Sequence, residues 1–340
     1  MGVRRFARPV HHVPKRDPPS PLPQPHGTAP WERPAHVDGR IKEVTKADLK
    51  VQRRVEKNRG NRPVRIKPIK PVRLHDKFIY YEKKGRLASL QGAVLQYAPQ
   101  LDGACVAAAL RALAIRNREL SPNHRRVFGM PDRVLDTLTY ATDVRLREKS
   151  FRPKYVAMLL DGMAKLKINP AEHAPNGEPL SDLIRAEVEA SAPHTKAMWI
   201  SDMVWGCLRH DIQLSDEALR AFCNTFAESR FKGISHFHVI SGFQNMIKMV
   251  EQRGGSREEV RALMPDTMSS SLCESITFRK NLKIAHIEAL MDLFDYLDFK
   301  FDQPVAVFVE ERFDAVELDE EHPLWERLAA MRPPLTEDKP

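Results

Sequence analysis

The sequence predicts a mainly α-helical protein whose helical body lies between two segments of different composition. Apolar residues recur every three to four positions from about residue 87 to 297, which is the spacing of one buried helix face. Residues 1–76 are strongly basic and rich in proline, which argues against long helices or sheet ladders there. We therefore expect three regions: an extended arm (1–86), a helical-repeat domain (87–300) and an acidic C-terminal extension (301–340).

The arm carries all of the excess positive charge of the chain. Residues 1–76 hold 19 Lys and Arg against 7 Asp and Glu, whereas residues 77–340 hold 35 against 38. The same N-terminal stretch also holds 12 of the 26 prolines. Because a Pro-rich cationic segment has little apolar surface to bury, it gains its shape by lying on a polyanion. The expected partner is a nucleic-acid backbone, with acidic protein surface and anionic lipid as the alternatives.

Two stretches of the arm are expected to contact RNA. A short basic helix is predicted over 45–59, where Thr45 and Asp48 form a start similar to a capping box. Residues 62–77 interleave cations with prolines, which hold the chain near an extended form from which the cations project. The two tyrosines that follow are candidates for stacking on bases. The candidate RNA-binding residues are Lys50, Arg53, Arg54, Lys57, Arg59, Arg62, Arg65, Lys67, Lys70, Arg73, Lys77, Tyr80, Tyr81, Lys83 and Lys84.

The helical domain is expected to contain about ten helices, mostly in pairs. Ser215, and Ser256 with Glu259, are predicted to cap two of them. Short motifs with one small residue among larger apolar ones recur along this domain, and their equivalent positions are Leu113, Met163, Cys207, Met246 and Phe294. The intervals between these positions are close to the length of a helix-turn-helix unit with variable loops. Such a period predicts helix-pair repeats stacked as an α-solenoid, and a globular helical bundle is the alternative.

The C-terminal extension is expected to be acidic and partly irregular. From residue 302 onward it holds 11 Asp and Glu against 4 Lys and Arg. The run PVAVFVEERF at 304–313 favours a short β-strand. A peripheral helix is expected around 323–331, packed through Leu324, Trp325 and Leu328.

The segment LDGACVAAALRALAIRNREL (101–120) resembles the helix-pair units of octotricopeptide and FAST-kinase-like proteins. These are organellar helical-repeat families that act on mitochondrial or chloroplast RNA. The resemblance spans residues 101–297 at most and consists of a pattern of small and apolar residues. It implies an organellar, RNA-associated protein.

Composition indicates the compartment. The four cysteines (Cys105, Cys207, Cys223 and Cys273) lie far apart on apolar helix faces, so we predict buried, reduced thiols and a reducing compartment. The stretch 1–16 contains five Lys and Arg and no acid, which is typical of a transit segment and favours the mitochondrial matrix. No run of residues is apolar enough to predict a membrane span.

No pattern predicts catalysis, a metal or a cofactor. The sequence contains neither of the Gly-rich phosphate-binding motifs. The pairs His236 with His238 and Cys207 with His210 both lack further ligands at zinc spacing. The serines of 269–275 are not part of a nucleophile elbow. We therefore expect a protein that is not an enzyme and needs no cofactor.

The first functional hypothesis is a structural subunit of a mitochondrial ribosome, or of a related organellar ribonucleoprotein. The arm would contact rRNA, and the helical domain would contact neighbouring proteins. The alternative is a protein-only scaffold subunit of a respiratory or ATP-synthase complex, whose arm contacts acidic subunits and lipid headgroups. A third hypothesis is a free regulator of organellar transcripts.

Overall fold

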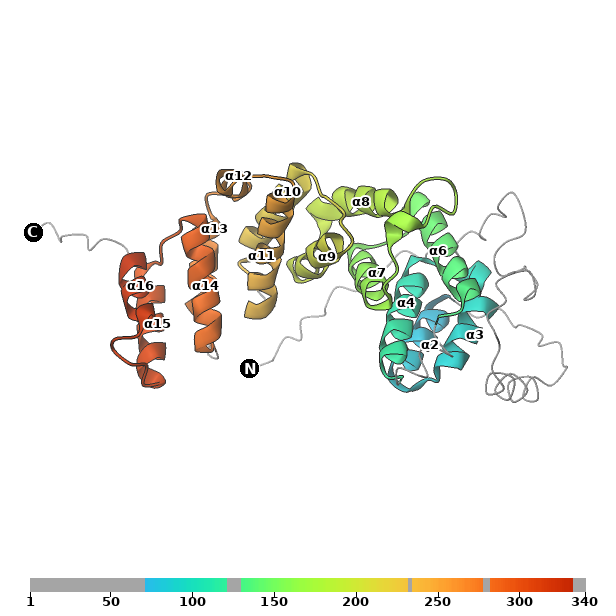
Figure 1. Ribbon diagram of the computed structural model, residues 1–340, viewed down its shortest axis with the longest axis horizontal. Helices are drawn as coiled ribbons and strands as arrows, with labels where there is room; N and C mark the ends of the chain where they lie inside the picture. Colours follow the sequence, from blue (N-terminus) through green and yellow to red (C-terminus); the bar gives the residue numbers. More distant parts are fainter. Residues whose placement is uncertain (1–70, 121–129, 232–233, 278–281, 333–340) are drawn as a thin grey trace, which may run out of the picture.

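The computed structural model describes residues 71–120, 130–231, 234–277 and 282–332, and these residues form an all-α fold. None of them belongs to a β-strand. The helices follow one another along the long axis of the molecule, from α2 (Pro71–Lys84) at one end to α16 (Pro323–Met331) at the other (Figure 1). The predicted helix at 45–59 and most of the predicted extended stretch at 62–77 lie outside the described residues.

Most helices belong to one of two rows in which each helix packs against the next. The first row consists of α4 (Gly103–Arg118), α7 (Pro153–Leu166), α9 (Ala197–Arg209), α11 (His236–Gln252) and α14 (Ile284–Leu297). The second row consists of α6 (Asp132–Arg147), α8 (Leu180–Ser191), α10 (Asp216–Ser229), α13 (Met268–Thr277) and α15 (Gln303–Ala315). The mainly α-helical body that the sequence predicts is therefore confirmed.

The remaining helices complete the two ends and one connection. Helix α2 packs against α4, and α3 (Leu87–Gln96) packs against α4 and α6. The short α12 (Arg257–Ala262) contacts both α11 and α14, and α16 packs against α15. Three 3-10 turns, η1 (Ala98–Gln100), η2 (Pro170–Glu172) and η3 (Ala192–His194), lie between helices of the body.

Glycines allow the first-row helices to approach closely. A Cβ atom added to Gly162 of α7 would lie 3.0 Å from the Cβ of Leu110 on α4. One added to Gly206 of α9 would lie 2.5 Å from the Cβ of Leu160 on α7. Both glycines belong to the small-among-apolar motifs found in the sequence, so these motifs mark positions where neighbouring helices meet.

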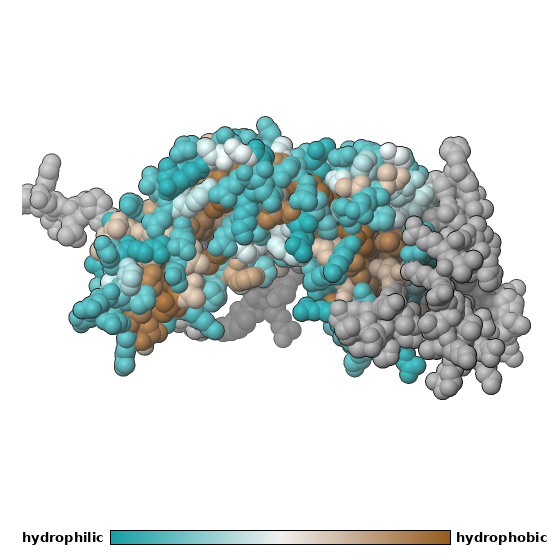
Figure 2. All heavy atoms as spheres, viewed as in Figure 1, coloured by the Kyte–Doolittle hydropathy of each residue, from teal (hydrophilic) through white to brown (hydrophobic). Residues whose placement is uncertain are grey.

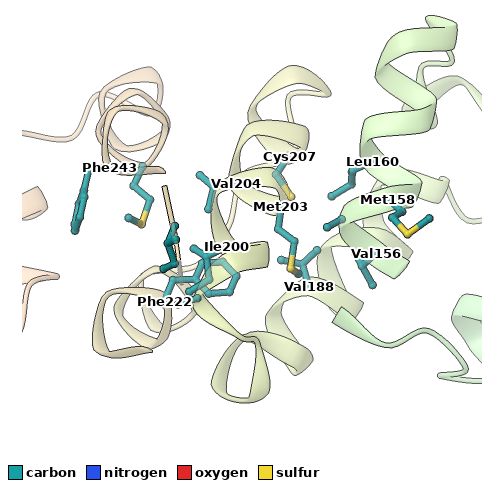
Figure 3. Close-up of a cluster of buried hydrophobic side chains, with 14 of the residues drawn as sticks. Val156, Met158, Leu160, Val188, Ile200, Met203, Val204, Cys207, Phe222 and Phe243 are labelled. Atoms are coloured by element: carbon teal, nitrogen blue, oxygen red, sulfur yellow. The ribbon is translucent and has the colours of Figure 1, made fainter. Parts of the chain in front are cut away.

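The hydrophobic core is one continuous cluster that runs through the body. In Figure 3, Val188 of α8 lies beside Met203 of α9, and Phe222 of α10 lies beside Ile200 of α9. The four cysteines are buried and free, as predicted. The predicted caps are also present, because the hydroxyls of Ser215 and Ser256 accept hydrogen bonds from the third backbone amide after each.

The prediction of a strand at 304–313 is wrong, because these residues lie within α15. The Asp302 carboxylate accepts a hydrogen bond from the Val305 amide, and Pro304 lies in the first turn, where proline favours a helix start. Val305, Val309 and Phe313 are buried four residues apart. The predicted helix at 323–331 is confirmed as α16, with Leu324 and Leu328 buried and Trp325 half-buried.

The predicted boundary of the arm at residue 86 is also corrected. Residues 71–84 form α2, whose Leu74 and Phe78 are completely buried in the core. These two side chains are four residues apart and therefore share one helix face. Residues 71–84 therefore belong to the folded body, and the rest of the predicted arm, 1–70, lies outside the described residues.

Most of the side chains on the face in Figure 2 are hydrophilic, with apolar ones between the helices and at the end where α15 and α16 lie. In the ranges that the structure describes, no helix combines the length and apolar character needed to cross a bilayer.

Candidate nucleic-acid interface

The predicted RNA-binding residues divide into two groups. Those on α2 are Arg73, Lys77, Tyr80, Tyr81, Lys83 and Lys84, and the side chain of Arg73 is outside the described structure. The other nine, Lys50, Arg53, Arg54, Lys57, Arg59, Arg62, Arg65, Lys67 and Lys70, lie outside the described residues. The α2 residues do not form one continuous surface, because the helix turns some of them towards the body.

Lys77 and Tyr81 attach α2 to the rest of the body. The Lys77 ammonium group donates a hydrogen bond to the Tyr97 hydroxyl at 3.3 Å and lies 4.7 Å from the centre of the Tyr97 ring. Tyr81 packs against the core, and its carbonyl accepts a hydrogen bond from Nε of Arg116 at 2.8 Å. Both side chains therefore pack partly against the body, and the RNA contacts expected of these two residues stay a prediction.

The exposed basic surface is found at the C-terminal end of α2. Tyr80 is 59% exposed, and Lys83, Lys84 and Arg86 are exposed as well. Tyr80, Lys83 and Lys84 are three and four residues apart, so they share one helix face. Arg86 is not among the predicted residues. These four residues, here called the basic end of α2, offer three cations for phosphates and one aromatic ring for a base.

Arg116 of α4 holds this end of α2 in place. Its guanidinium donates to the carbonyls of Tyr81 and Glu82 in the last turn of α2, and the Tyr81 carbonyl also accepts a hydrogen bond from the Gly85 amide at 3.1 Å. A cation at this position also interacts favourably with the partial negative charge of the helix C-terminus. The position of the exposed lysines is therefore fixed by the body.

A groove on α4, α7 and α9 is a second candidate site, which the sequence did not reveal. It has a volume of about 210 Å³, and its polar and aromatic lining consists of Arg111, Asp161, Lys165, Trp199 and Asp202. Arg111, Asp161 and Asp202 follow one another along the chain at nearly the same intervals as the small-among-apolar motifs. The spacing of those motifs in the sequence is therefore a signal that could have predicted that α4, α7 and α9 pack side by side.

The side chains considered for chemistry in the sequence make ordinary structural contacts. The hydroxyls of Ser270, Ser271 and Ser275 donate to backbone carbonyls at 2.9–3.1 Å. Nε2 of His236 lies 3.2 Å from Nε2 of His286. Across the part of the chain that the structure describes, no three His, Cys, Asp or Glu residues are grouped as metal ligands would be.

His210 is buried, and its Nε2 lies 3.3 Å from the Leu160 carbonyl. Burial lowers the pKa of this imidazole. Burial also raises the pKa values of the cysteine thiols, that of Cys223 to about 12 and that of Cys273 to about 11. These groups are therefore held in their neutral forms, which suits a core and not a nucleophilic site.

No protein-family model and no curated protein matches this chain.

Proposed function

We propose that the protein is a non-catalytic structural subunit of a mitochondrial ribosome, or of a closely related organellar ribonucleoprotein. One observation carries this proposal: the positive charge of residues 1–76 continues onto the exposed basic end of α2, which is part of the folded body. A cationic segment joined to an ordered basic surface suits a long phosphate backbone, because each neutralised phosphate adds to the affinity. The partner that follows is rRNA.

The body supports the scaffold part of the proposal. Its two rows of helices, each packed only on near neighbours, are arranged as in stacked helix-pair repeats, and we infer an α-solenoid. Such an arrangement presents a long surface to neighbouring proteins. The resemblance of 101–297 to octotricopeptide and FAST-kinase-like repeats agrees with a place in the mitochondrial matrix.

Sedimentation of tagged protein from a mitochondrial lysate tests the proposal. We expect the full-length chain to sediment with a ribosomal subunit, to shift to lighter fractions after ribonuclease treatment, and to co-purify rRNA with ribosomal proteins. A chain lacking residues 1–70 should be largely displaced from these fractions. This deletion retains α2, whose Leu74 and Phe78 belong to the core.

Two results would contradict the proposal. Sedimentation that ribonuclease does not change, together with co-purified respiratory or ATP-synthase subunits, would establish the protein-only scaffold. Association with one transcript in light fractions, away from ribosomes, would establish a free regulator of organellar transcripts.

A further inference from the structure

One surface of the first row contains an unusual concentration of exposed apolar side chains. Six large apolar residues are well exposed in the described ranges, and three of them lie here: Met198 and Trp205 of α9, and Phe237 of α11. The most exposed of the three is Phe237, at 64%. Asp202 lies between Met198 and Trp205 on the same face of α9, at helical spacing. Phe237 is close to this face, because its ring centre is 5.7 Å from that of His238, whose Nε2 lies 3.9 Å from Oδ1 of Asp202.

Asp202 differs from the other charged residues of the adjoining groove. Lys165 is paired with Asp161 at 2.7 Å, and Arg111 lies 3.5 Å from Glu82. Within the described structure, no donor forms a hydrogen bond with the Asp202 carboxylate, and the nearest basic side chain is the imidazole of His238, whose Nε2 lies 3.9 Å from Oδ1. Partial burial raises the pKa of this carboxyl, although Lys165 and Arg111 act in the opposite direction and the side chain is still 44% exposed. A cationic side chain of a partner molecule would give the Asp202 carboxylate the charge-assisted hydrogen bond that it lacks within the described structure.

We propose that this α9 surface, formed by Met198, Asp202, Trp205 and Phe237, binds a segment of a partner protein that places one cationic side chain, arginine or lysine, in the groove beside Asp202. The proposal rests on the protein contacts that the proposed function assigns to the body. The cation donates to the carboxylate and packs against the indole of Trp199, which lines the same groove. Apolar residues that flank the cation in the partner contact Met198, Trp205 and Phe237.

The size and charge of the groove favour this occupant. Its volume of about 210 Å³ is below the roughly 300–1,000 Å³ of small-molecule pockets and suits a single side chain. The lining contains two carboxylates and two cations, and both cations already lie beside a carboxylate, Lys165 beside Asp161 and Arg111 beside Glu82. Asp202 is therefore the charge of the groove that is left for a partner, and its sign opposes a phosphate backbone. Aromatic residues and methionine, which predominate on this surface, are enriched in protein–protein interfaces.

Selection of peptides from a random dodecapeptide phage library on the full-length protein tests the proposal. We expect the selected peptides to contain arginine or lysine next to apolar residues. Their affinity, measured by calorimetry as synthetic peptides, should fall at least tenfold on Asp202→Asn and several-fold on Trp205→Ala. Asp182→Asn should have no effect, because this carboxylate lies on α8 in the second row and is paired with Arg185 at 3.3 Å.

A change in the peptide alone provides the second measurement. Replacing the arginine of a selected peptide by citrulline, its uncharged isostere, should weaken binding to the unaltered protein as much as Asp202→Asn does. Because burial disfavours the charge of Asp202, the Asn variant should remain folded, which circular dichroism checks.

Three outcomes would overturn the proposal: selected peptides without a cation, equal affinity for the protein and its Asp202→Asn variant, or displacement of the peptides by an RNA oligonucleotide whose own binding requires Asp202. None of them affects RNA binding through the basic end of α2, which involves different residues.

Discussion

His210 illustrates how one buried titratable group affects the whole fold. Its imidazole lies beside the Leu160 carbonyl and joins the end of α9 to α7. Because burial lowers its pKa, the folded chain keeps this residue neutral at pH values where the unfolded chain binds a proton. Protonation therefore favours the unfolded state.

This predicts a loss of stability on acidification. The unfolded imidazole titrates near pH 6.5. Above that pH the stabilising effect of the lowered pKa is fully present, and as the pH falls below it the free energy of unfolding decreases, by at most about 1.4 kcal/mol per pH unit for one proton. Urea unfolding of full-length protein between pH 7.5 and 5.5 measures this slope.

The variant His210→Gln, which does not titrate, should show a shallower dependence on pH over the same range. His194→Gln serves as the matched control, since His194 is exposed on the 3-10 turn before α9. The prediction fails if the His210 variant and the unaltered protein have the same pH slope.

At the scale of helices, glycine positions determine how closely the first row packs. The Gly206→Ala variant should be destabilised by about 1–3 kcal/mol, because its new Cβ would lie 2.5 Å from the Cβ of Leu160 and would force α7 and α9 apart. The change in the denaturation midpoint measures this effect.

Gly92→Ala is the matched control for this experiment. Gly92 lies inside α3, and a Cβ atom added there would meet nothing within 4 Å. Alanine should therefore stabilise this helix by about 0.5–1 kcal/mol. If both variants shifted the midpoint in the same direction, close packing at Gly206 would not be the reason for its glycine.

The helices of the body can be predicted from sequence because their buried faces and caps are local signals. The sequence predicts a strand at 304–313 because Val305, Val307 and Val309 alternate with other residues, which is a β pattern. The same run also places Val305, Val309 and Phe313 four residues apart, and Val307 is 40% exposed in the helix. Asp302 and Pro304, which start that helix, are the signals that distinguish the two interpretations.

The candidate sites could be predicted only in part, because they depend on contacts between helices that are far apart in the sequence. Lys77 and Tyr81 belong to a basic stretch of sequence, but the burial of Leu74 and Phe78 turns these two side chains towards the body. The groove joins residues from three helices, so its composition depends on which helices are neighbours. That information is tertiary, and the apolar periodicity of one helix does not contain it.

At the scale of the whole molecule, charge is divided between an N-terminal region that is basic and a body that is nearly neutral. Removing residues 1–70 should therefore lower the affinity for single-stranded RNA and reduce the dependence of log Kd on log salt concentration. Each phosphate contact that is lost should reduce that slope by about 0.7. Fluorescence anisotropy with a labelled oligonucleotide, in a series of KCl concentrations, measures both quantities.

The residual binding should depend on the basic end of α2. In the shortened chain, Lys83→Gln with Lys84→Gln should weaken RNA binding further, whereas Lys248→Gln on α11 should not. Unchanged affinity and salt slope after removal of residues 1–70 would show that the cationic region is not the RNA-binding element.

The attachment of α2 to α4 also has a mechanical consequence. A force applied to the chain before Pro71 would act first on the N-terminal turns of α2. Leu74 and then Phe78 would have to leave the core before the rest of α2 could unfold. The bonds from Arg116 to the final turn lie farthest from the point of traction and would rupture last. Force applied at the N-terminal side of the body would therefore unfold α2 first, while the two rows of helices remain folded.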